Sequence, residues 1–218
     1  TYLIITLSSV IFSLYAFEVY LTTKEVHLTT TGVLDKKIKL YKQQTGKDYD
    51  TRTRLKIYND LKKEHENIAI PVTPGSYLAQ QNKLFPLSGI SNSKTVLCNE
   101  NGYYSIYQSD RYGFNNPDSE WDKKEIEYLL VGDSFTNGEC VNRPDDIASV
   151  LRTLSKKSAL NLGYRGNGPL IEYATLREYL KPNVKNVLWV FFDNDTINLD
   201  RELNSEILTS YLKDLNFS

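Results

Sequence analysis

The stretch YLLVGDSFTNGECV, residues 128–141, decides how the second half of this 218-residue chain is interpreted. An apolar run stops at Gly132 and is followed at once by an acid, a hydroxyl and several small polar residues. The apolar run has the composition of a buried strand. Its abrupt polar end is typical either of a tight turn or of a nucleophile held at the rim of a sheet. Ser134 is the residue on which the two interpretations differ.

The segments on either side of this stretch alternate between strand and helix. Apolar runs predict strands at 126–131, 158–164 and 186–192, and helical spacing of apolar residues predicts helices at 144–154, 168–180 and 201–215. In the first helix Pro144 suits the first turn, and one apolar stripe contains Ile147, Val150, Leu151 and Leu154. Alternation of this kind predicts right-handed βαβ units. The expected fold class is therefore α/β, a three-layer parallel sheet with flanking helices.

A polar cluster follows each of the three predicted strands. The clusters are Gly132-Asp133-Ser134, residues 163–168 (GYRGNG) and residues 193–195 (DND). The carboxyl ends of parallel strands share one edge, where ligands bind in open α/β folds. Ser134 can attack a carbonyl there, and the resulting oxyanion needs donors. Glycine backbone and the asparagine side chain can supply them, so the pattern predicts an ester-cleaving site.

The three clusters resemble the first three sequence blocks of the SGNH hydrolases, also called the GDSL family. The matching segments are GDSFTNG, NLGYRGNGP and FFDNDTINL, between residue 132 and residue 199. The resemblance implies a flavodoxin-like SGNH fold, with Ser134 as nucleophile and backbone donor, Gly166 as a second backbone donor and Asn194 as the third-block asparagine. It implies no cofactor and no metal.

A narrower resemblance precedes the serine strand. The segment SDRYGFNNP, residues 109–117, is similar to membrane-anchored bacterial members of the family that handle acyl groups on envelope glycans. It implies a serine ester hydrolase or an O-acyltransferase whose partner is an acylated small molecule or glycan.

Two features depart from the family pattern. Asp193 stands where the family has glycine, and a carboxylate about 6 Å from the oxyanion would cost about 3 kcal/mol unless it points away or pairs with Arg165. The family's Asp-x-x-His motif does not follow Asn194, and the two histidines, His27 and His65, precede the serine strand. We expect the natural protein to continue beyond residue 218 with another strand and this motif; the alternative is that the chemistry has been lost.

Other functions fit parts of the same sequence. LWVFFDNDTI, residues 188–197, nearly matches the Asp-x-Asp motif of haloacid dehalogenase-like phosphatases, which would make Asp193 the nucleophile and Asp195 the acid/base and would require Mg²⁺. A non-catalytic glycan-binding or scaffold domain is a further alternative. In purely structural terms, Ser134 would cap a helix, the glycines would form turns, and Asn194 and Asp195 would form an Asx turn after the strand.

The chain before residue 126 is expected to contain a membrane helix and a mixed lead-in. Residues 1–21 are apolar, with no charge before Glu18, which predicts a transmembrane or signal-anchor helix; a buried helix is the alternative. Residues 22–90 form the lead-in, with a helix within 49–65, and residues 91–218 form the SGNH-like domain, incomplete at its C-terminal end. Asn101-Gly102 predicts the turn of a hairpin.

Charge and cysteine content restrict partners and location. The chain has 26 basic and 27 acidic residues, and this balance argues against a nucleic-acid partner. Cys98 and Cys140 are the only cysteines, and they are either two buried thiols or a disulfide, which we expect. A disulfide favours an extracytoplasmic, periplasmic domain, whereas the lysines between residues 24 and 42 favour the cytoplasm. We expect a membrane-anchored extracytoplasmic protein.

Overall fold

The chain forms two compact units. The computed structural model describes residues 2–79, 84–193 and 195–213, with the backbone alone for residues 2–4 and 23–31. By its internal contacts the chain divides between Thr51 and Arg52. Residues 22–90, predicted as one lead-in region, are therefore shared between the two units.

The first unit is built on one long helix, α1 (Tyr2–Thr45). Its segment Ile5–Thr22 has a mean hydropathy of 1.5, and none of this segment is buried against other parts of the protein. An apolar helix that is exposed all round is typical of a membrane span, although a signal sequence has the same character. After the helix the chain folds back through an ion pair between Lys42 and Asp48 at 2.7 Å.

The second unit opens with α2 (Arg54–Leu61) and a small mixed sheet. β1 (Ile68–Ala69) pairs parallel with β2 (Lys94–Val96), and β2 pairs antiparallel with β3 (Ile106–Gln108). A short 3-10 helix, η1 (Pro74–Tyr77), lies between β1 and β2. The predicted hairpin is confirmed, and Gly102 adopts a φ of 87° in its turn.

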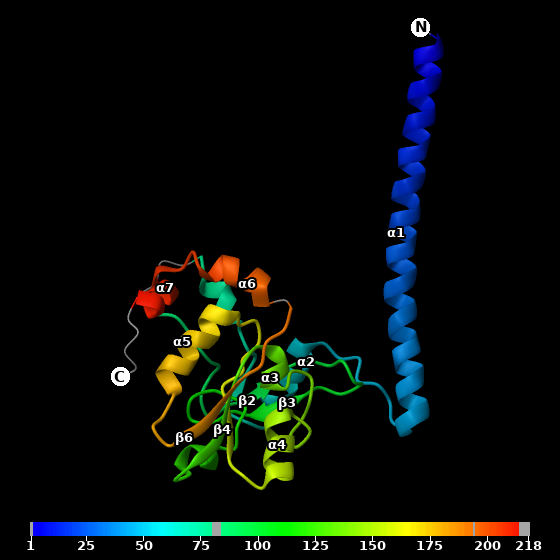
Figure 1. The fold of residues 1–218 in the computed structure, drawn as a ribbon. Coiled ribbons are helices and arrows are strands. Elements are labelled where there is room, and N and C mark those ends of the chain that lie inside the picture. The colour runs from blue at the N-terminus through cyan, green and yellow to red at the C-terminus, as the bar shows by residue number, and fades with distance from the viewer. Residues whose placement is uncertain (1, 80–83, 194, 214–218) are drawn as a thin grey trace. The chain divides into compact units, whose positions relative to one another are not determined.

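A parallel three-stranded sheet forms the centre of the second unit (Figure 1). Its order is β5 (Ala159–Asn161), β4 (Ile126–Val131), β6 (Val184–Trp189), so β4 is the middle strand. The α/β class and the parallel sheet are as predicted.

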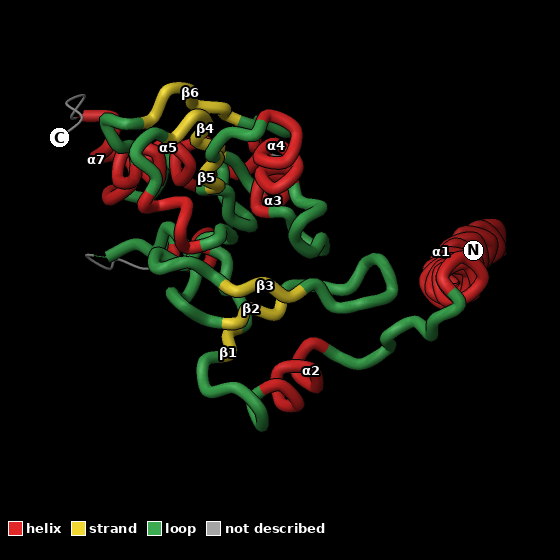
Figure 2. Tube along the Cα trace, turned by 90° about the horizontal axis from the view of Figure 1, so that it is seen from below, coloured by secondary structure: helices red, strands yellow, loops and turns green. Residues whose placement is uncertain are grey.

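Helices lie on both faces of this sheet. α5 (Pro169–Tyr179) and α7 (Glu206–Lys213) lie on one face, with α3 (Ser134–Asn137) and α4 (Ile147–Ser155) on the other (Figure 2). Leu129 of β4 packs in the cluster that contains Leu176 of α5, whereas Leu130 packs with Ala148 of α4. The strand β4 thus contributes core residues to both faces, which explains its continuous apolar sequence.

The orientation of α4 differs from the prediction. The helix buries Ala148 and Ser149, whereas three residues of the predicted stripe, Ile147, Val150 and Leu154, are exposed. The fourth, Leu151, is partly buried and packs against the core as predicted. The polar face is held against β5 because the Arg152 guanidinium donates to the Ala159 carbonyl at 2.6 Å and to Ser149 Oγ at 3.0 Å. Pro144 lies before the helix, and Asp146 caps it by accepting the Ser149 N–H.

The single helix predicted at 201–215 is wrong. Two helices, α6 (Asp195–Glu202) and α7, occupy this region, and residues 214–215 lie outside the described residues. Ser205 lies just before α7 and caps it, since its carbonyl and hydroxyl accept the N–H groups of Thr209 and Leu208. The break leaves Leu203 exposed and directs Glu202 into the interior.

Candidate functional site

Ser134 lies at the carboxyl end of the middle strand of the parallel sheet. β4 ends at Val131, and Ser134 is the first residue of α3. From β4 the chain passes to β5 on one side and later to β6 on the other. The strand order therefore reverses at β4, and ligands of open α/β sheets bind at such a topological switch point.

The helix α3 packs tightly on two strand ends because both carry glycine. A Cβ atom on Gly132 would lie 2.2 Å from Thr136 Oγ1, and one on Gly163 would lie 2.5 Å from Thr136 Cβ. Only glycine leaves room for this approach. The sequence places Gly163 in the second polar cluster, where a glycine would form a turn, but its role in the structure is to admit the helix that carries Ser134.

Buried asparagines hold the same helix from two further segments. Asn161, at the end of β5, donates through its amide to the Thr136 carbonyl. Asn115 donates to the Asn137 carbonyl at 2.9 Å, and Asn116 accepts the Asn161 N–H at 2.8 Å. These positioning residues were not predicted. The available signal was the segment SDRYGFNNP, which contains Asn115 and Asn116.

The rest of that segment forms a buried hub. The Asp110 carboxylate is fully buried and accepts the N–H groups of Tyr112 and Phe114 at 2.9 Å each. It also accepts the Asn116 amide and the Trp121 indole N–H. Four donors compensate the burial of this charge. The segment therefore has a structural role: it connects the lead-in to the serine helix.

The predicted disulfide is confirmed. Cys98 and Cys140 are joined with a Cα–Cα distance of 5.1 Å across 42 positions of sequence. Cys140 lies just after α3 and Cys98 just after β2, so the bond connects the hairpin to the serine turn. Asn101 reinforces this link by donating to the Cys140 carbonyl at 3.3 Å.

The residue that caps α3 is Asp133, not Ser134. The Asp133 carboxylate accepts the Phe135 N–H at 2.9 Å, and the Ser134 hydroxyl donates to the same carboxylate at 3.4 Å. The interpretation of Ser134 as a helix cap is therefore wrong. Among the described residues, no backbone N–H donates to its hydroxyl.

Two backbone N–H groups are available at this edge. Within the described ranges, the N–H groups of Ser134 and Gly166 donate to no acceptor. Gly166 is exposed and adopts a φ of 71°, a left-handed conformation that glycine accommodates readily. Both groups can therefore donate to a ligand.

The third cluster is only partly described, because Asn194 lies outside the described residues. Asp193 is exposed, and the Arg165 guanidinium pairs with Glu139 at 2.7 Å rather than with Asp193. Asp195 is fully buried, and its carboxylate accepts the Phe192 N–H at 2.7 Å. The two carboxylates of the alternative phosphatase motif thus differ in exposure. Among the described residues, no three His, Cys, Asp or Glu side chains gather to hold a metal ion.

The one histidine whose side chain the structure describes, His65, makes no hydrogen bond to the serine. His65 is exposed and its Nε2 lies 2.7 Å from Lys94 Nζ, next to the small mixed sheet. The side chain of His27 lies outside the described residues. In the described structure, the hydrogen-bond partner of the Ser134 hydroxyl is Asp133.

A further buried carboxylate, that of Glu172, lies behind the same edge. Glu172 of α5 is fully buried and accepts the Trp189 indole N–H. Burial, together with the nearby Asp195, Asp133 and Glu202 carboxylates, raises its pKa to about 8, although the hydrogen bond from Trp189 lowers the pKa. Glu172 is therefore largely protonated at neutral pH.

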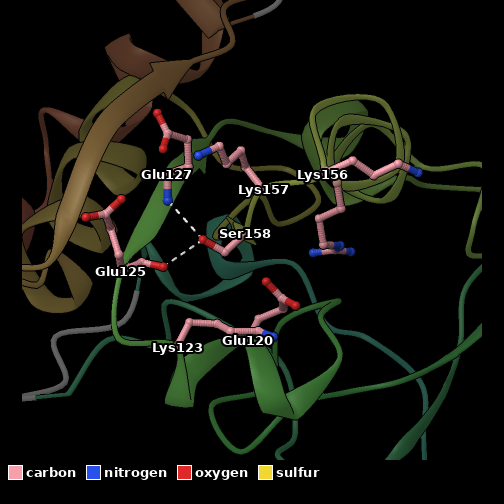
Figure 3. Close-up of a pocket in the computed structure, with 8 residues that line it drawn as sticks. Glu120, Lys123, Glu125, Glu127, Lys156, Lys157 and Ser158 are labelled. Atoms are coloured by element: carbon pink, nitrogen blue, oxygen red, sulfur yellow. Dashed lines mark hydrogen bonds between the residues drawn. The ribbon is translucent and has the colours of Figure 1, made fainter.

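The hollow shown in Figure 3 lies at the opposite edge of the sheet. It measures about 420 Å³ and surrounds the amino ends of β4 and β5, where the Ser158 hydroxyl donates to the Glu125 carbonyl at 2.8 Å and accepts the Glu127 N–H at 3.0 Å. Acidic and basic side chains both line it. This hollow is separate from the candidate site, which is at the carboxyl ends.

No protein-family model, curated protein or solved structure matches this chain. Any function of this chain is therefore inferred from the geometry around Ser134.

Proposed function

We propose that this chain carries the site of a serine ester hydrolase or O-acyltransferase, with Ser134 as the nucleophile. The observation that carries the proposal is the place of Ser134, the first residue of α3 at the switch point of a parallel sheet. The free N–H groups of Ser134 and Gly166 support it, because an acyl-transfer reaction needs donors for the oxyanion.

The chemistry follows from these groups. Ser134 Oγ attacks the ester carbonyl carbon, its proton passes to a general base, and the carbonyl oxygen becomes an oxyanion held by the two N–H groups. The carbon–oxygen bond of the ester then breaks, and the alcohol leaves with that proton. Water or another hydroxyl group next releases the acyl group from Ser134. The resemblance implies Asn194 as a further oxyanion donor and a histidine as the base.

The fold and the N-terminal unit support an assignment to the SGNH family and to the cell envelope. Spatial order β5-β4-β6 corresponds to the start of a flavodoxin-like sheet, in which the second strand lies outside the first and the third lies on its other side. An apolar helix together with a disulfide favours a membrane-anchored domain in an oxidising compartment. Acyl esters of envelope glycans are then the expected substrates.

The test is covalent labelling of the full-length protein in detergent with a fluorophosphonate, combined with turnover of an aryl acetate. Wild type should be labelled, and Ser134→Ala should lose both labelling and turnover. Ser119→Ala is the matched control, because Ser119 is exposed and its side chain makes no hydrogen bond in the described structure. Equal turnover by wild type and Ser134→Ala rules the proposal out, and phosphatase activity that requires Mg²⁺ favours the alternative.

A further inference from the structure

The start of α5 is capped by a residue from a distant helix. Gly168 is the N-cap of α5 and has no side chain to accept the first N–H groups. The Glu202 carboxylate of α6 accepts them instead: from Gly168 at 2.7 Å, Leu170 at 2.8 Å and Ile171 at 3.3 Å. A serine or aspartate at the N-cap would satisfy such groups locally. Here the cap comes from 34 positions further along the chain.

Glu202 is an unusual residue to cap a helix. It is 1% exposed, and no ion pair among the described residues includes it. Burial raises the pKa of its carboxyl, while the three N–H groups lower it. The bonds to the helix N-terminus therefore compensate a charge that has lost its water. The packing is close as well, because a Cβ atom on Gly168 would lie 2.6 Å from Glu202 Oε1 and 2.5 Å from Asn198 Cβ.

This contact connects two of the three clusters at the candidate site. Gly168 lies two positions after Gly166, the second predicted backbone donor, and α6 begins at Asp195, immediately after Asn194. Glu202 thus links the loop of the second cluster to the helix that follows the third. A displacement of about 1 Å at an oxyanion donor lowers catalysis by up to about a hundredfold.

We propose that Glu202 is a positioning residue, which fixes the Gly166 N–H relative to Ser134 by holding the start of α5. The inference rests on the proposed role of Gly166 as an oxyanion donor. Its effect passes through the backbone of residues 166–168, and Glu202 itself, buried behind the loop, does not contact the substrate.

The test compares Glu202→Ala and Glu202→Gln with wild type in the full-length protein in detergent. Glu202→Ala leaves three N–H groups without an acceptor, so amide hydrogen exchange over residues 166–171 should rise and kcat for an aryl acetate should fall about a hundredfold. KM should change less than threefold, because a positioning residue acts on the transition state. Glu202→Gln keeps one of the two acceptor oxygens, so it should recover about tenfold of the lost kcat and leave kcat about tenfold below wild type. Glu206→Gln is the control, since Glu206 is exposed at the start of α7.

The outcomes separate this inference from the proposed function. If wild type neither reacts with the fluorophosphonate nor turns over ester, the proposed function fails, and the catalytic role of Glu202 fails with it. If wild type is active and Glu202→Ala keeps kcat within twofold, only the positioning role is overturned. If Glu202→Ala unfolds, Glu202→Gln decides: an unchanged kcat with unchanged exchange over residues 166–171 overturns the inference.

Discussion

At the scale of single residues, the position of Ser134 depends on atoms that are missing from its neighbours. Gly163 has no Cβ, and Thr136 and the Asn137 N–H occupy the space where that atom would be, at 2.5 and 2.6 Å. A mutation at Gly163 therefore acts on the serine helix without touching Ser134. Gly75 offers a contrast, because a Cβ atom there would meet its nearest neighbour at an ordinary 3.6 Å.

Gly163→Ala should lower the free energy of unfolding by about 2 kcal/mol, since overpacking of this kind costs about 1–3 kcal/mol. It should also slow fluorophosphonate labelling of Ser134, because α3 must move away from β5. Urea unfolding and the labelling rate check the two effects. Gly75→Ala should leave both unchanged. A Gly163→Ala protein as stable and as reactive as wild type would show that α3 does not depend on this close approach.

The buried carboxyl of Glu172 should make the free energy of unfolding depend on pH. Its pKa rises from an ordinary 4.5 to about 8 in the folded state, so the folded protein holds a proton that the unfolded chain releases. Stability from this group is complete below about pH 4.5 and is lost as pH rises toward 8. Glu172→Gln keeps the acceptor for the Trp189 N–H but cannot ionise. At pH 8 the free energy of unfolding of Glu172→Gln should exceed that of wild type by about 2 kcal/mol. One pKa unit corresponds to about 1.4 kcal/mol, so half of the shift in the pKa of Glu172 is enough to give this difference.

Urea unfolding at pH 5 and pH 8 measures this difference. Glu206→Gln, at an exposed position, should follow wild type at both pH values. If Glu172→Gln and wild type lose the same free energy of unfolding between pH 5 and pH 8, the pH dependence belongs to other groups.

At the scale of elements, β6 is the least covered strand of the parallel sheet. Val187, Leu188 and Trp189 are 40%, 37% and 43% exposed, although they belong to one of the most apolar segments of the chain. In the part of the chain that the structure describes, β6 pairs only with β4. An apolar strand with one open edge tends to pair with another chain.

Leu188→Lys should therefore reduce self-association of residues 52–218 at micromolar concentration, as measured by sedimentation velocity, with little change in thermal stability. Leu154→Lys is the matched control: Leu154 is 78% exposed on α4, away from the strand edge, so its substitution should leave association unchanged. If both variants associate like wild type, the edge of β6 is not the contact.

At the scale of the whole molecule, the apolar helix and the disulfide lead to the same expectation about location. Ile5–Thr22 can cross a membrane by length and composition, and the bond between Cys98 and Cys140 is stable in an oxidising compartment. The two features lie in different units, so each can be tested by itself.

We predict that the protein sediments with membranes. In cells quenched with acid, its cysteines should resist alkylation and should react only after a reductant is added. Deletion of residues 2–22 should move the protein to the soluble fraction and leave both thiols reactive, because the domain then stays in the reducing cytoplasm. Chain-entropy arguments give the loss of the disulfide a cost of about 4 kcal/mol, measurable by urea unfolding. A disulfide that persists after the deletion would contradict this account of the location.

The sequence by itself determined the local structure and several long-range features. Apolar periodicity predicted the strands 126–131 and 158–164, the helix 168–180 and their parallel arrangement, since period and alternation depend on neighbours in sequence. The two cysteines predicted their own pairing, and the abrupt polar end of β4 singled out Ser134.

Tertiary structure alone decided the strand order, the buried face of α4 and the partners of the buried polar groups. The order β5-β4-β6 places Ser134 at the switch point, and periodicity carries no information about order. Ile147 and Val150 predicted the wrong buried face because Arg152 bonds to β5, and 201–215 divides into two helices where Glu202 turns inward to cap α5. Each of these outcomes depends on hydrogen bonds and packing between segments far apart in sequence, which buried polar groups require and local patterns do not encode.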